Sequence, residues 1–339
     1  MIEKYYNGVI EQVVGGIGNV EHNSILVRYS NDFSIWDLES VNHYKDQTDI
    51  FFTCHEFSYN KIAEAYEPYL GLIRQMFHKY CSGTLEEFME ECDVYKLQRP
   101  VFESYFEKGF CERTEQILID EVEYEQERMR NSIVTMLQKL SEIRPVVIVL
   151  NRFQLASKST MQLSNSLLQV KNKNIGIVLG VNDVQSIPEF AHEEWDAICE
   201  SMDDRNMVYH IGNAGRNMEP DVMDYYSDYE SDDGYRKLNN LVYFLDFDQA
   251  DHHLSKIERR IKFDNFTISE KKHYQLLLLQ IMVSVLQRDI AKALESCEDL
   301  EKLQDQEKEG AFYYNFWMAT SYMYLGKLEE AMIYVQKLS

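Results

Sequence analysis

An uninterrupted apolar run at residues 145–150, PVVIVL, constrains the fold of this chain more than any other feature. A strand without polar alternation is buried on both faces, which is typical of a parallel sheet covered by helices. The run ends at Asn151 and Arg152. An amide is neutral and a guanidinium has the wrong sign for a metal cation, so the end of this strand lacks the chemistry of a metal site.

Strand patterns alternate with helical patterns over the first 250 residues. The expected strands lie at residues 24–29, 49–54, 146–150, 174–181, 207–211 and 241–247. The expected helices lie at residues 35–43, 61–80, 112–142, 160–170 and 189–202, with short helices broken at Pro100 between residues 84 and 110. This order predicts an α/β domain at residues 1–250, with a parallel sheet and helices on both of its faces.

The remainder, residues 251–339, has no further strand pattern and reads as helix throughout. Residues 313–339 resemble a tetratricopeptide repeat through small and aromatic residues at Ala319, Tyr322, Gly326, Leu328 and Ala331. The two alanines let antiparallel helices approach closely, and Gly326 suits the turn between them. Ile290 and Ala293 echo the pattern one repeat earlier. We therefore predict an all-α tetratricopeptide-like second domain, with an unrelated helical hairpin as the alternative.

The final predicted helix carries an apolar face that needs a neighbour. Met332, Val335 and Leu338 lie on it, and a repeat of this type cannot bury its apolar face alone. We therefore expect that the protein continues past Ser339, so that the repeat region is truncated in this sequence, or that another chain covers this face.

Charge and cysteine content restrict the partners and the compartment. The 339 residues include 57 acidic and 34 basic side chains, for a formal net charge of −23, which disfavours direct nucleic-acid binding. The six cysteines form no C-x-x-C pair, so neither a zinc site nor a disulfide framework is indicated. Neither a signal peptide nor an apolar run of membrane-spanning length is visible. We expect a soluble cytoplasmic protein without membrane contact.

The segment after the buried strand, NRFQLASKS at residues 151–159, is similar to a motif of the STAND branch of the AAA-like P-loop ATPases. In that family the strand is followed by two acids, an apolar residue, Gln or His, an aromatic residue, Ala, an acid and then Ser. Gln154, Ala156 and Ser159 fit, whereas all three acids are missing. The two acids would hold Mg²⁺ and orient water, so Asn151 and Arg152 are vestigial Walker B positions.

The phosphate loop of that family would follow the first strand, and it too is degenerate. Aligning Leu38 with the leucine that usually follows the loop places Tyr29 and Ser34 at its two glycine positions, Ile35 at the lysine and Trp36 at the Ser/Thr. These vestigial positions supply neither the backbone freedom nor the cation that a phosphate needs. We expect Trp36 to fill the space where phosphate would lie.

Two other segments have a weak resemblance to ligand loops. The glycine-rich residues 13–19, VVGGIGN, precede the first strand and lack a lysine, so we interpret them as a turn. The acidic residues 219–235 faintly resemble a calcium loop, but Asp233 and Asn239 occupy the positions that require Gly and an acid. We interpret this segment as a solvated mobile loop.

Together these features predict a non-catalytic regulatory module without a cofactor. It would be a pseudo-ATPase scaffold that gates an effector domain and binds protein partners through the helical repeats. The resemblance implies effectors such as those of a diguanylate cyclase or a transcriptional regulator, of which this chain would be the N-terminal region. Two alternatives are a divergent ATPase that binds ATP or ADP as a nucleotide-regulated switch, and a pure interaction scaffold whose sheet domain is a spacer.

Overall fold

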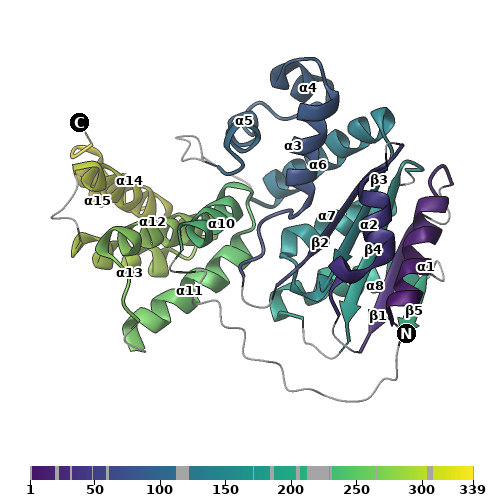
Figure 1. The fold of residues 1–339 in the computed structure, drawn as a ribbon. Helices are drawn as coiled ribbons and strands as arrows, with labels where there is room; N and C mark the ends of the chain where they lie inside the picture. Colours follow the sequence, from purple (N-terminus) through teal and green to yellow (C-terminus); the bar gives the residue numbers. More distant parts are fainter. Residues whose placement is uncertain are drawn as a thin grey trace. The chain divides into compact units, whose positions relative to one another are not determined.

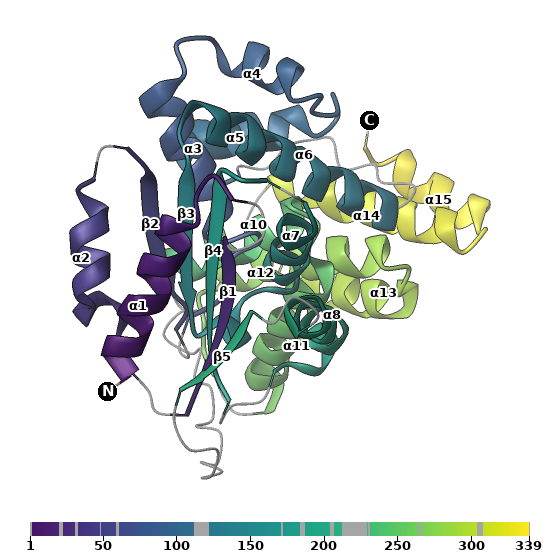
Figure 2. The same ribbon diagram turned by 90° about the vertical axis from the view of Figure 1, so that its right-hand side faces the viewer.

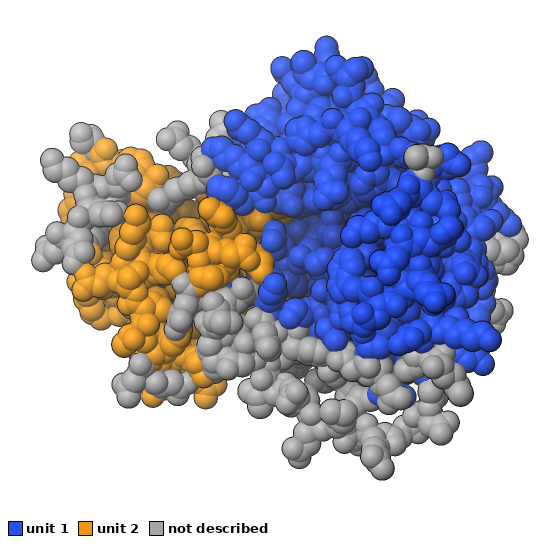
Figure 3. All heavy atoms as spheres, in the orientation of Figure 1, with its two compact units in different colours: residues 1–116, 126–228 blue, residues 117–125, 229–339 orange. Residues whose placement is uncertain are grey.

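The computed structural model shows a five-stranded parallel sheet and a separate set of helices (Figure 1). It describes residues 2–19, 23–30, 33–47, 49–58, 61–111, 122–170, 172–183, 187–203, 207–211, 229, 231–263, 266–303 and 308–338. The chain forms two compact units, one of residues 1–116 and 126–228 and the other of residues 117–125 and 229–339 (Figure 3).

The sheet of the first unit confirms the predicted α/β fold. Its strands are β1 (Ser24–Tyr29), β2 (Phe51–Glu56), β3 (Val146–Asn151), β4 (Ile175–Asn182) and β5 (Val208–Ile211), and all of their pairings are parallel, in the order β2-β3-β4-β1-β5. Every residue of β3 and β4 is buried. This agrees with the unbroken apolar runs of both segments, because covered parallel strands need no polar face.

Helices cover both faces of this sheet (Figure 2). One face carries α1 (Ile2–Gly15) and α2 (Glu39–Lys45), and the other carries α6 (Val122–Ile143), α7 (Lys158–Gln169) and α8 (His192–Asp203). Helix α1, to which the sequence analysis assigned no element, packs on β1, β3 and β4. Gly176 in β4 permits this contact, because a β-carbon there would lie 2.7 Å from Val13 Cγ1.

Several predicted helices are shorter in the structure than in the sequence analysis. Residues 35–43 divide into a single 3₁₀ turn, η1 (Ile35–Asp37), and α2, while the helix expected at residues 61–80 begins at Tyr69 as α3 (Tyr69–Tyr80). The expected short helices are α4 (Leu85–Glu91) and α5 (Arg99–Lys108), and Pro100 lies in the first turn of α5. A proline is tolerated there because the amide it lacks would be unpaired anyway. Residues 112–121 lie outside the described part.

From residue 231 onward, the described part of the second unit forms three helix pairs, and one predicted strand proves wrong. Its helices are α10 (Asp232–Tyr243), α11 (Phe247–Phe263), α12 (Glu270–Leu286), α13 (Ile290–Glu301), α14 (Lys308–Tyr324) and α15 (Leu328–Val335). Residues 241–247, LVYFLDF, are the end of α10 and its turn into α11 rather than a strand. A short apolar run has the same appearance in a buried strand and a buried helix end. The unit therefore includes residues that the sequence analysis had placed before residue 250.

The three helix pairs share one turn geometry. Leu245, Arg288 and Gly326 follow the first helix of each pair with φ of 66°, 62° and 70°. In each turn the next amide bonds back five residues, from Asp246 to Leu241, Asp289 to Ser284 and Lys327 to Tyr322, at 2.8 to 2.9 Å. A second bond spans three residues, so each is a Schellman motif. A buried alanine follows each turn in the second helix, at Ala250, Ala293 and Ala331.

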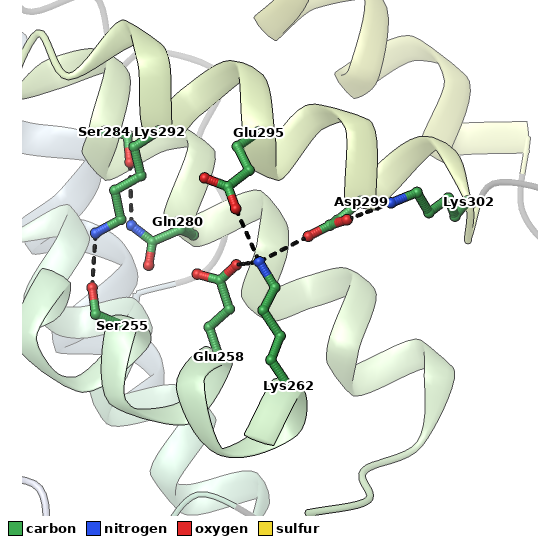
Figure 4. Close-up of polar contacts among 9 residues, drawn as sticks. All are labelled: Ser255, Glu258, Lys262, Gln280, Ser284, Lys292, Glu295, Asp299 and Lys302. Atoms are coloured by element: carbon green, nitrogen blue, oxygen red, sulfur yellow. Dashed lines mark hydrogen bonds and ion pairs between the residues drawn. The ribbon is translucent and has the colours of Figure 1, made fainter. Parts of the chain in front are cut away.

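An ionic seam joins the second helices of the first two pairs. Figure 4 shows the Lys262 ammonium of α11 among three carboxylates, at 2.8 Å from Glu258, 3.1 Å from Glu295 and 3.3 Å from Asp299. At the other end of the seam, Lys292 of α13 contacts Asp251 Oδ1 at 2.6 Å and Ser255 Oγ at 2.7 Å. These ion pairs fix the register of α11 against α13, because sliding one helix along the other would separate Lys262 and Lys292 from the carboxylates that they contact.

None of the helices in the described part is both long and apolar enough to cross a membrane. The predicted acidic loop at residues 219–235 lies mostly outside these residues, and its described end begins α10, where Ser231 Oγ accepts the Gly234 amide at 2.8 Å.

Candidate functional site

The topology of the sheet places a candidate site at the carboxyl ends of β1 and β4. The chain leaves β1 towards α2 and leaves β4 towards α8, and these helices lie on opposite faces (Figure 2). Neighbouring parallel strands whose connections diverge in this way form a topological switch point, where open α/β sheets bind their ligands. Tyr29 ends β1, and Asn151 ends β3 on the far side of β4.

At this edge the predicted loop position Tyr29 meets the predicted Walker B position Asn151. The Tyr29 hydroxyl donates to Asn151 Oδ1 at 2.8 Å, and Asn151 Nδ2 lies 3.5 Å from the Phe33 carbonyl oxygen. Both side chains are buried. The phenol of Tyr29 therefore reaches from the end of β1 to the end of β3, where the side-chain amide of Asn151 is its hydrogen-bond partner.

Three of the other four predicted positions, Ser34, Ile35 and Arg152, converge on the carboxylate of Glu56, the last residue of β2. Its Oε2 accepts the Ser34 hydroxyl and the Ile35 amide, each at 3.2 Å. Its Oε1 lies 2.9 Å from Arg152 Nη1, and both side chains of this ion pair are largely buried. An internal carboxylate thus accepts from the turn that the resemblance assigns to phosphate, and it also neutralises the cation at the end of β3.

Tyr6 of α1 closes this arrangement from one face of the sheet. Its ring contacts Phe33 with centroids 5.1 Å apart, and Phe33 in turn contacts the Tyr29 ring at 4.9 Å. A β-carbon at Gly180 of β4 would collide with the Tyr6 hydroxyl and would lie 2.7 Å from Asn151 Oδ1. Glycine at this position therefore makes room for the side chains that fill the switch point.

The Tyr6 hydroxyl is buried and has no hydrogen-bond partner among the described residues. Burial raises the pKa of this phenol well above its usual value, and the nearby Glu56 and Cys54 add to the effect. The group therefore stays neutral and does not act as a base at ordinary pH. A buried hydroxyl without a hydrogen-bond partner lowers the stability of the folded state. The contribution of Tyr6 to the fold therefore comes from the packing of its ring and not from its hydroxyl.

Trp36 does not lie where the sequence analysis expected it. Its side chain is 48% exposed, and its ring lies under the Lys45 ammonium at 5.8 Å. The buried residue of this turn is Ile35 instead. The reason is the length of η1: a single 3₁₀ turn capped by Ser34 points successive side chains in different directions, so Ile35 turns inward and Trp36 outward.

The residues that fit the family motif hold the fold together. Gln154 Oε1 accepts the amide of Asn182, the last residue of β4, at 3.2 Å. Ser159 Oγ accepts a hydrogen bond from the Tyr66 backbone amide at 3.2 Å. Ala156, which lies between Gln154 and Ser159 in the sequence, is buried. Gln154 thus ties the loop after β3 to the end of β4, and Ser159 ties α7 to the loop before α3.

Sequence reasoning missed Glu56, Tyr6 and Gly180. It ended the second strand at Cys54, two residues early, so Glu56 was not placed at the sheet edge. Glu56 ends β2, the strand that pairs with β3, and it lies opposite Asn151 in that pairing. An acid at this strand end is the signal in the sequence that could have indicated an ion-pair partner for Arg152. Tyr6 and Gly180 leave no comparable signal, because their role depends on how α1 packs on β4.

The chemistry available at this edge is limited. The Arg152 guanidinium is neutralised by Glu56, and the turn amide at Ile35 already has its acceptor. No group of three His, Cys, Asp or Glu side chains suited to a metal ion occurs in the described part of the chain.

Comparison with models of protein families, with curated proteins and with solved structures finds no match for this chain.

Proposed function

We propose that this chain is a non-catalytic regulatory scaffold: a P-loop-like unit whose nucleotide site is filled by its own side chains, joined to helical repeats that bind protein partners. In this role the first unit holds or gates an effector, and the repeats recruit partners. The six cysteines are reduced thiols, which supports action in a reducing compartment such as the cytoplasm.

One observation carries the proposal for the first unit. Five of the six positions at which the resemblance expects phosphate and Mg²⁺, all except Trp36, are bonded to each other or to Glu56. A nucleotide would have to break the Tyr29–Asn151 bond and the Glu56–Arg152 pair before it met a donor. Loss of the groups that stabilise a transferring phosphoryl group costs orders of magnitude in rate, so this edge has no means of supporting hydrolysis.

The repeated turn supports the proposal for the second unit. Three helix pairs with the same Schellman turn and a buried alanine at the same place form a regular array. Arrays of this kind present extended side-chain surfaces to other proteins. The tetratricopeptide character of the pairs rests on the residues from Ala319 to Ala331 and is part of this proposal.

Phosphate release from Mg²⁺-ATP tests the catalytic half. We expect a rate equal to the buffer control for the wild-type chain and for the matched variants Arg152→Ala and Tyr29→Phe. A release rate that is present in the wild type and lost in Arg152→Ala would show that the edge is an active site. The alternative of a nucleotide-regulated switch would then replace the scaffold.

A further inference from the structure

The contact between α11 and α13 depends on charge at both of its ends. At one end Lys262 of α11 meets Glu295 and Asp299 of α13, as Figure 4 shows. At the other end the signs are reversed, because Asp251 of α11 meets Lys292 of α13 at 2.6 Å. Each helix therefore carries an acid opposite a cation of its neighbour, and both ends contribute attraction between the first two helix pairs.

The contact between the second and third pairs does not repeat this pattern. The shared turn makes positions in the second helices comparable, so that Asp251 of α11 corresponds to Leu294 of α13. By the same count from the turn, Lys292 of α13 corresponds to Glu330 of α15. Leucine cannot form an ion pair with glutamate. Charge thus holds the first two pairs together at a place where the third pair has no equivalent ion pair.

The apolar packing of α11 on α12 is incomplete beside this contact. A hollow of about 10 Å³ lies between the two helices. Five aliphatic side chains line it: Leu254, Ile257, Ile261, Leu276 and Leu277. Gln280 also lines it, and the side-chain oxygen of this residue is buried without a hydrogen-bond partner among the described residues. Lost dispersion contacts and an unpaired oxygen both weaken an interface, so α11 relies the more on its charged contacts with α13.

Solvent ions have access to the group that we call the Lys262 cluster, which consists of Lys262, Glu258, Glu295 and Asp299. The side chain of Lys262 is 38% exposed and that of Glu295 is 67% exposed. The hydrogen bond to Glu258 raises the pKa of Lys262, although partial burial opposes this, so the ammonium keeps its charge at ordinary pH. Salt screens such exposed charges, because the Debye length falls from about 30 Å at 0.01 M to about 3 Å at 1 M.

We propose that the Lys262 cluster is an ionic latch, which holds the end of α11 against α13 and releases it when the charge of Lys262 is screened or removed. Without that charge, Glu258 of α11 would face Glu295 and Asp299 of α13, and attraction would change to repulsion. The latch lies within the second unit and does not rest on the proposed function. Either one can therefore fail while the other stands.

Hydrogen exchange of backbone amides in the full chain tests the latch. Exchange in residues 256–263, the second half of α11, is compared at about 0.01 M and about 1 M KCl, after correction for the effect of salt on an unfolded peptide. We expect the higher salt to speed exchange in this segment at least about threefold. Exchange in α14 and α15 should stay unchanged, because the charged contact lies between α11 and α13.

Variants then assign the effect to Lys262. Lys262→Met keeps the aliphatic stem and removes the charge, so at low salt it should speed exchange in residues 256–263 at least about threefold. Added salt should have little further effect on this variant, and Lys262→Arg should restore the wild-type rate. Lys302→Met is the matched control, because the ammonium of Lys302 is 72% exposed and bonds to Asp299 of the same helix. It should exchange like the wild type.

Equal exchange rates in the wild type and Lys262→Met, or the same acceleration by salt in both, would overturn the proposal. So would an acceleration that spreads equally to α14 and α15, because it would show a general loosening of the unit. If Lys262→Met does not fold, the wild-type salt series decides alone. Acceleration confined to α11 and α13 then supports the latch, and unchanged exchange overturns it.

Discussion

At the scale of single residues, Asn151 decides how the end of β3 behaves. It accepts from the Tyr29 hydroxyl and lies in reach of the Phe33 carbonyl, without exposure to solvent. The proposed family resemblance would place an acid at this position, whereas the amide found here takes part in buried hydrogen bonding. An aspartate could still accept from Tyr29 but could not donate to Phe33.

Restoring the acid should consequently destabilise the protein. We expect Asn151→Asp to lower the free energy of unfolding by about 1–3 kcal/mol, because it buries a charge and leaves an acceptor unpaired. Urea unfolding measures the change. Asn131→Asp, on the exposed side of α6, is the control and should alter stability by less than about 0.5 kcal/mol. If Asn151→Asp were neutral and bound Mg²⁺, the edge would be a metal site after all.

Gly180 and Tyr6 should behave as a coupled pair. Gly180→Ala places a methyl group against the Tyr6 hydroxyl, and we expect a loss of about 1–3 kcal/mol from overpacking. Tyr6→Phe removes an unpaired buried hydroxyl and should be neutral or stabilising. The double variant should recover only part of the loss, because the added carbon still lies 2.7 Å from Asn151 Oδ1. Additive effects in this cycle would mean that α1 does not press on β4 at Gly180.

His253 gives the second unit a pH dependence. The ring lies 3.0 Å from Tyr229 Oη and 3.1 Å from Gln249 Nε2. Burial, with smaller effects of His252 and Lys256, lowers its pKa to about 3. The unfolded chain takes up this proton near pH 6.5 and the folded chain does not. Its stability contribution is thus complete above about pH 6.5 and declines as the pH falls towards 3.

His253→Gln should therefore flatten the pH dependence of stability. Between pH 7 and pH 5 we expect the wild type to lose up to about 1.4 kcal/mol per pH unit more than the variant, measured by urea unfolding. His43→Gln, on an exposed residue of α2, is the matched control. Parallel curves for the wild type and His253→Gln would contradict the burial of a neutral ring.

At the scale of elements, the turn that joins each helix pair is the recurring part. Glycine occupies the left-handed position only in the third pair, where Gly326 lies, whereas Arg288 holds it in the second. A side chain in this region is strained, so the second turn is less stable than it could be. The three turns otherwise make the same two hydrogen bonds.

Exchanging these residues should change stability in opposite directions. Arg288→Gly is expected to raise the free energy of unfolding by a few tenths to about 1 kcal/mol, and Gly326→Ala to lower it by about 1 kcal/mol. Thermal unfolding of both variants measures the shifts. A destabilising Arg288→Gly would show that the arginine side chain makes a contact that outweighs the strain of its backbone.

The elements also show what a sequence can reveal and what it cannot. The buried strands β3 and β4 were predictable, because an unbroken apolar run between two helical segments is typical of a parallel strand that is buried on both faces. Residues 241–247 have the same appearance and form a helix end, because periodicity does not separate the two in a short segment. The repeated turn escaped notice in the first pair because Leu245 stands where Gly326 stands in the third.

At the scale of the whole molecule, the candidate site was predicted in outline and not in its contents. The six vestigial positions came from the motif, and five of them meet each other or Glu56 at one edge of the sheet. The partners that complete the arrangement, Glu56 and Tyr6, come from β2 and α1, and such long-range packing leaves no local pattern. Trp36 was misplaced because a single 3₁₀ turn cannot be read from residue types.

If the chain's own side chains fill the proposed nucleotide site, added nucleotide should not stabilise the folded protein, and thermal unfolding measures this. A ligand bound to the folded state at a hundred times its dissociation constant adds about 2.7 kcal/mol. We predict that millimolar Mg²⁺-ATP, ADP or GTP leaves the melting temperature unchanged. A rise with any of them that disappears in Arg152→Ala would contradict the account.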